Sequence, residues 1–97
     1  SVEGRELLLC ILSSEENIKN IDQIKKNNRI LTGLEQGTVQ GKTLPIVWLS
    51  YNIHGNESVS SEAAMATVYS LLTNEFPNSA DWLNEVVVVI DPCENPD

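Results

Sequence analysis

Residues 44–72, LPIVWLSYNIHGNESVSSEAAMATVYSLL, form the stretch that decides the fold. It opens with a run rich in Ile, Val, Trp and Tyr, which predicts a buried strand over residues 45–53 with Trp48 and Tyr51 in the core. After the turn HGNE, apolar residues recur at helical spacing and predict a helix over residues 58–74. The residues expected to form its apolar stripe are Val59, Ala63, Ala64, Val68, Leu71 and Leu72.

Two further apolar runs flank this unit and predict two more strands. ELLLCIL indicates a strand over residues 6–12, covered on both faces, and the β-branched run VVVVI indicates one over residues 86–91. The second and third strands are expected to be parallel neighbours, because a helical crossover joins them. We therefore expect an α/β fold with at least two parallel strands.

Two more helices are expected. Ser13 and Glu16 form a capping box that starts a helix over residues 14–31, and Ser79 is expected to cap a short helix over residues 79–84. The residues expected to share one face of the longer helix are Ile18, Ile21 and Ile24.

Composition excludes several classes of protein. The chain has 97 residues, enough for one small domain, and 41% of them are apolar, which is typical of a globular protein. Its formal charge of −8 argues against nucleic acid as a partner, and no apolar run is long enough for a membrane span. Residues 32–43 carry three glycines but no GK[ST], which indicates a surface loop and not a phosphate site.

The turn HGNE holds the only histidine, His54, three residues before Glu57. An imidazole and a carboxylate are two of the three protein ligands that a catalytic zinc site usually takes. By itself the motif is weak, because a polar turn with Glu57 near a helix N-terminus gives the same letters. The nearby serines, Ser58, Ser60 and Ser61, are read as helix-capping residues, and Glu62 as a solvated side chain.

Three segments together are more specific than the motif. EGRELL at residues 3–8, YNIHGNESVSSEAA at 51–64 and DPCENPD at 91–97 resemble, in order and approximate spacing, the zinc carboxypeptidases of the M14 metallopeptidase family. The resemblance implies a three-layer α/β fold in which these residues form part of a mixed central sheet. It also implies that His54 and Glu57 bind one Zn²⁺ ion, and that Asn95, Pro96 and Asp97 belong to a loop that shapes the substrate pocket.

The resemblance also implies a function. It indicates a metallocarboxypeptidase that hydrolyses the C-terminal bond of a peptide substrate with metal-activated water, in the periplasm or outside the cell. The second zinc histidine and the catalytic glutamate of the family are expected beyond Asp97, so residues 1–97 are read as a single partial domain, the N-terminal part of a catalytic domain. Two alternatives stay open: an amidase or deacylase on the same scaffold, such as an aspartoacylase-like enzyme or a peptidoglycan-peptide hydrolase, and a non-catalytic truncated module.

Two structural expectations follow. In the family the first strand runs antiparallel to the third, so Cys10 and Cys93 are expected at opposite edges of the sheet, as free thiols. A sheet of three strands also has an unpaired edge, through which the chain is expected to self-associate.

Overall fold

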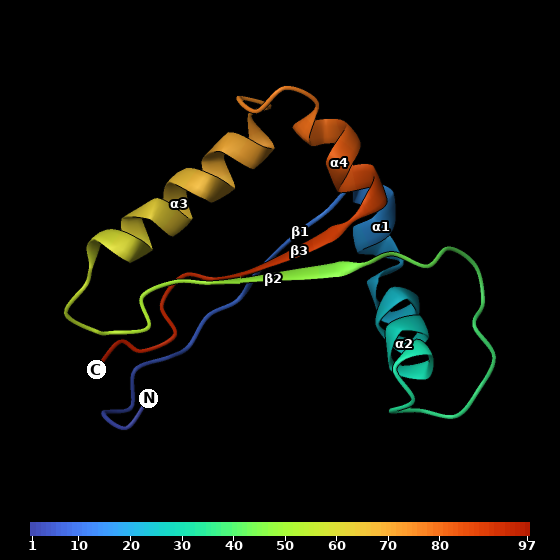
Figure 1. Ribbon diagram of the computed structural model, residues 1–97, viewed down its shortest axis with the longest axis horizontal. Helices are drawn as coiled ribbons and strands as arrows, with labels where there is room; N and C mark the ends of the chain where they lie inside the picture. Colours follow the sequence, from blue (N-terminus) through green and yellow to red (C-terminus); the bar gives the residue numbers. More distant parts are fainter.

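Three strands and four helices make up the chain, and the computed structural model describes all 97 residues (Figure 1). The elements are β1 (Cys10–Leu12), α1 (Glu15–Lys19), α2 (Ile21–Leu31), β2 (Ile46–Ser50), α3 (Val59–Leu72), α4 (Ser79–Glu85) and β3 (Val87–Asp91). No helix among them is long and apolar enough to span a bilayer. Residues 32–43 form neither helix nor strand, as predicted.

The strands form one mixed sheet in the order β1-β3-β2. β2 and β3 are parallel, in a register that begins with Ile46 beside Val87, and α3 and α4 lie in the connection between them. β1 is antiparallel to β3, with Cys10 opposite Ile90. The predicted α/β class and the predicted parallel pair are therefore confirmed.

The first strand is shorter than predicted. It covers Cys10–Leu12 and not residues 6–12. Continuing its register would set Leu8 opposite Pro92, which has no N–H to donate to a neighbouring strand. Residues 6–9 therefore precede β1 without pairing to another strand, and their three leucines are each more than half exposed.

The helix predicted over residues 14–31 is divided into α1 and α2. At Asn20, φ is −103° and ψ is 16°, outside the usual helical values. As a result Ile24 is buried while Ile18 is exposed, so the three isoleucines do not share one buried face.

Two serines predicted to cap helices instead form hydrogen bonds within the fold. The Ser13 hydroxyl donates to the carbonyl oxygen of Leu83 at 2.9 Å. Ser14 caps α1 in its place, because its side chain accepts a backbone N–H of the first turn. Ser79 is the fully buried first residue of α4, and its hydroxyl donates to the carbonyl oxygen of Leu71 at 3.0 Å. Both hydroxyls thus join separate elements.

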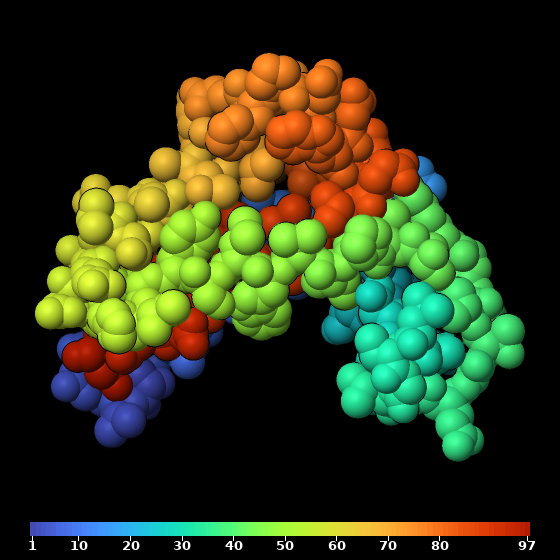
Figure 2. All heavy atoms as spheres, in the orientation of Figure 1, coloured from blue at the N-terminus to red at the C-terminus, as the bar shows by residue number.

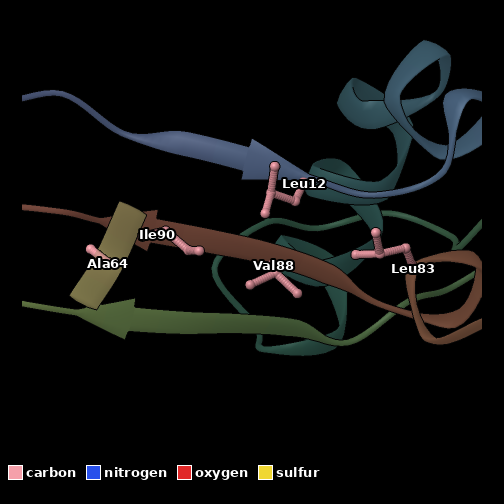
Figure 3. Close-up of a cluster of buried hydrophobic side chains, with 5 residues drawn as sticks. All are labelled: Leu12, Ala64, Leu83, Val88 and Ile90. Carbon is pink, nitrogen blue, oxygen red and sulfur yellow. The ribbon is translucent and has the colours of Figure 1, made fainter. Parts of the chain in front are cut away.

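β3 carries the core, because its side chains alternate between the two faces of the sheet. Under α3 and α4 the buried cluster is Leu12, Ala64, Leu83, Val88 and Ile90 (Figure 3). Under α2 it is Ile24, Leu44, Val87 and Val89. Each buried Val or Ile contributes about 1.5–3 kcal/mol to folding, so β3 is the largest single contributor to stability.

The apolar stripe of α3 is narrower than predicted. Ala64 is fully buried, and Val68 and Leu71 are half-buried against the sheet. The other three predicted positions, Val59, Ala63 and Leu72, are exposed. Neighbouring residues of a helix point about 100° apart, so of the pair at 71 and 72 only one can face the sheet.

The prediction that β2 is buried is wrong. Its residues Ile46, Val47 and Trp48 are exposed, with 55% of Trp48 accessible, because β2 forms one edge of the sheet. Tyr51 is half-buried, and its hydroxyl lies 3.0 Å from the hydroxyl of Thr67 on α3. On the α2 side of the sheet, an apolar hollow of about 420 Å³ is lined by residues of all three strands, Trp48 among them. The space-filling view shows the molecule hollowed between the sheet and α2 (Figure 2).

Cys10 and Cys93 are both free and half-buried, which agrees with the prediction of two thiols. The prediction that the two cysteines lie at opposite edges of the sheet is wrong. Because β1 is antiparallel to β3, Cys10 lies opposite Ile90, at the end of the sheet where the loop with Cys93 begins. The two cysteines therefore belong to the same end of the sheet.

Candidate functional site

The segments that follow β2 and β3 lie together beyond the sheet. Where the parallel ladder ends, the N–H of Tyr51 donates to the carbonyl oxygen of Asp91 at 2.9 Å. The N–H of Glu94 then donates to Tyr51 at 3.0 Å, and the N–H of Asn95 donates to the carbonyl oxygen of Asn52 at 3.1 Å. Backbone pairing thus continues past the strands and places the turn HGNE beside the segment CENPD.

The turn HGNE leads directly into α3. The strand predicted over residues 45–53 is shorter than predicted, because β2 ends at Ser50, so His54 lies in the turn and not directly at the end of a strand. The N–H of Glu57 donates to the carbonyl oxygen of His54 at 2.9 Å, and the N–H of Ser60 donates to that of Glu57 at 2.9 Å. His54 and Glu57 are both exposed. The imidazole and the carboxylate are therefore carried by one hydrogen-bonded turn and are open to a ligand.

Asn52, which the sequence reasoning missed, lies beneath this turn. It is 5% exposed and has a left-handed backbone, with φ of 53°. With its amide nitrogen directed at the turn, it donates to the carbonyl oxygens of His54 at 3.0 Å and Glu57 at 2.8 Å. The other end of the amide lies 3.0 Å from the sulfur of Cys93. The available signal was an asparagine between a strand and a turn, where this residue type tolerates positive φ.

Gly55 allows the two segments to approach. A Cβ atom at this position would lie 2.7 Å from the carbonyl carbon of Asp97 and 3.0 Å from the carbonyl oxygen of Asn95. Contacts of that length to backbone atoms would force one segment to move. The second residue of HGNE is therefore a glycine because the NPD segment packs against it.

The EGR segment closes the assembly from the other side. Arg5 donates through Nη1 to the carbonyl oxygen of Pro96 at 2.7 Å and to Oδ1 of Asp97 at 3.0 Å. Its Nη2 pairs with Glu3 at 2.7 Å. The backbone N–H of Val2 donates to Oδ2 of Asp97 at 2.8 Å. The three segments singled out in the sequence thus meet at one place.

The pKa of Asp97 reflects these contacts. Desolvation acts to raise it, but hydrogen bonds from the Ser1 side chain and from the backbone N–H groups of Glu3 and Val2, together with the Arg5 charge, outweigh that effect. The pKa of Asp97 is therefore lowered, and its side chain accepts these bonds as a carboxylate.

The prediction that the serines after the turn cap α3 with their side chains is wrong. Ser58 occupies the N-cap position but makes no capping hydrogen bond with its hydroxyl. Ser61 instead donates to the carbonyl oxygen of Pro92 at 2.8 Å, which joins the first turn of α3 to the loop after β3. Glu62 is exposed, in agreement with the prediction of a solvated side chain.

The turn HGNE carries two side chains of the kinds that bind zinc. His54 and Glu57 offer one nitrogen and one carboxylate, and both types of ligand suit zinc. No group of three or more His, Cys, Asp and Glu side chains in the chain is placed to hold a metal ion. These residues therefore fit as two ligands of a site that needs a third, and their assignment as zinc ligands stays a prediction.

Comparison with known protein families gives a match over the whole chain. A family model described as zinc carboxypeptidase matches residues 1–97. No curated protein and no solved structure matches the chain.

Proposed function

Because this chain belongs to the zinc carboxypeptidase family, we propose that it is part of the catalytic domain of a metallocarboxypeptidase that acts on the C-terminal bond of a peptide. In this proposal His54 and Glu57 are two of the protein ligands of one zinc ion. The observation that carries it is the meeting of the EGR, HGNE and NPD segments through Arg5, Gly55 and Asp97. If the three motifs matched by chance, we would not expect them to be in contact in the folded chain.

The residues of this chain would contribute position and charge. The His54–Glu57 hydrogen bond sets the two ligand residues on one turn, and Asp97 and Pro96, held by Arg5, shape the wall next to it. A zinc ion bound there would supply the Lewis acidity that polarises a scissile carbonyl group and lowers the pKa of water. Residues 1–97 would supply two of the ligands, since His54 is the only histidine and no group of three His, Cys, Asp or Glu side chains is placed to hold a metal ion.

Zinc titration of the chain tests the ligand assignment. We expect zinc to shift the ring signals of His54 in NMR spectra, which are unambiguous because the chain has one histidine. Two ligands hold the ion weakly, so we expect affinity weaker than micromolar and no hydrolysis of a hippuryl-type substrate. His54→Ala and Glu57→Gln should each weaken binding at least about tenfold, which corresponds to about 1.4 kcal/mol.

Glu62→Gln is the matched control, because it removes an exposed carboxylate of α3 that the proposal does not use. Its zinc affinity should equal that of the unchanged chain. If His54→Ala binds zinc as tightly as the unchanged chain, His54 is not a ligand. Submicromolar affinity with turnover would show that the chain holds a complete site, contrary to the proposal.

A further inference from the structure

We propose that Asn52 is the positioning residue of the His54–Glu57 turn: its side-chain amide binds the carbonyl oxygens of both residues and so fixes their relative position. As a statement about zinc, this inference rests on the proposed function. As a statement about the turn, it rests on the contacts of Asn52 alone.

The amide of Asn52 is suited to this role. Each of its two N–H groups has an acceptor, at 3.0 Å on His54 and 2.8 Å on Glu57. These carbonyl groups belong to the first and last residues of HGNE, so one rigid amide spans the whole turn. The residue is 5% exposed, and water therefore cannot easily replace these bonds.

Asn52 also connects the turn to the neighbouring loop. Its backbone carbonyl oxygen accepts the N–H of Asn95 at 3.1 Å, and the oxygen of its side-chain amide lies 3.0 Å from the sulfur of Cys93. The backbone of Asn52 is left-handed, with φ of 53°. Few residues other than Gly, Asn and Asp adopt that conformation at low cost.

Outer-shell groups that orient metal ligands change metal affinity by about 10- to 100-fold when they are removed. Loss of the Asn52 amide would leave the turn with the single internal bond between Glu57 and His54. The two side chains would then have to be ordered when the metal binds, which weakens binding.

Two variants separate the side chain from the backbone. Asn52→Gly keeps access to positive φ and removes the amide, whereas Asn52→Asp keeps the shape and replaces two N–H donors by acceptors. Asn27→Asp is the matched control: Asn27 is also fully buried, and its amide donates to the carbonyl oxygens of Gln40 at 2.7 Å and Lys42 at 3.2 Å, away from HGNE.

The first readout is the hydrogen-exchange rate of the Glu57 backbone amide, measured by NMR in the absence of metal. We expect exchange at least about tenfold faster in both Asn52 variants, after correction for any change in global stability. Asn27→Asp should leave the corrected rate unchanged. An unchanged Glu57 rate in Asn52→Gly would overturn the inference.

The second readout is zinc affinity. We expect it to fall about 10- to 100-fold in the Asn52 variants and to stay unchanged in Asn27→Asp. Equal losses in Asn27→Asp would show that the effect comes from overall stability and would overturn the positioning role. If the unchanged chain binds no zinc, the proposed ligands fail, while the exchange of Glu57 still decides whether Asn52 holds the turn.

Discussion

Gly55 packs against Asp97 so closely that a methyl group at position 55 would lie 2.7 Å from the backbone carbon of Asp97. The two residues are 42 positions apart in sequence, yet their contact decides how the turn HGNE and the NPD segment sit together. The first prediction follows from this contact.

Gly55→Ala should destabilise the chain by about 1–3 kcal/mol, because the new Cβ has no space without movement of backbone. Denaturant unfolding measures the loss, and NMR shifts of Asn95 and Asp97 should report the displaced loop. Gly33→Ala is the control, since Gly33 has open space around it but φ of 77°. It should cost stability through its backbone and leave the signals of Asn95 and Asp97 in place. Unmoved signals in Gly55→Ala would contradict the packing.

Arg5→Lys should loosen the NPD segment. A lysine keeps the charge but cannot reproduce the fork that binds Pro96, Asp97 and Glu3 together. Because Arg5 is about half exposed, the loss of stability should be small, about 0.2–1 kcal/mol. The clearer measurement is hydrogen exchange at Val2, whose N–H binds Asp97.

Arg29→Lys provides the comparison for Arg5, because Arg29 pairs with Glu35 at 3.1 Å on another surface. Its effect on stability should be similar and its effect on the exchange of Val2 absent. Equal exchange of Val2 in both variants and in the unchanged chain would show that Arg5 does not hold the segment.

Acid should free Asp97 from its hydrogen bonds only at pH values below 3.8. Its pKa is lowered from the usual 3.8, so the stability that it contributes is complete above that value and is lost as the pH falls below 3.8 through the lowered pKa. NMR titration of the side-chain carboxyl carbon should give a midpoint below 3.8, and Arg5→Gln should raise it. A midpoint at or above 3.8 in the unchanged chain would contradict the contacts described.

The isolated chain should self-associate through β2. That strand is an edge of the sheet, and its exposed Trp48 adjoins the apolar hollow. Light scattering after size exclusion should give a mass above 10.7 kDa that falls with dilution. Trp48→Lys should restore the monomer, whereas Trp82→Lys, which changes an exposed tryptophan of α4, should not. A monomer at all concentrations would exclude the interface.

The sequence was informative where local pattern and register decide the outcome. The β-branched run VVVVI at 86–90 predicted the strand that is β3, and its parallel pairing with β2 brought HGNE and NPD to one end of the sheet. It was misleading for Trp48, because the exposure of a strand depends on which segments cover it and not on its own composition. The motif at His54 and Glu57 could be found by pattern, but the buried amide of Asn52 could not, since its partners are backbone groups.

The backbone hydrogen bonds beyond the sheet also limit where residues can be inserted into or deleted from the chain. Successive backbone hydrogen bonds join Tyr51 and Asn52 to Asp91, Glu94 and Asn95. One inserted residue in either segment would shift every later hydrogen bond and move Gly55 away from Asp97. Residues 32–43 form no such ladder. Insertions and deletions should therefore be tolerated there and rejected between residues 51 and 57 or 91 and 97, which makes the spacing of the motifs as strong a constraint as their letters.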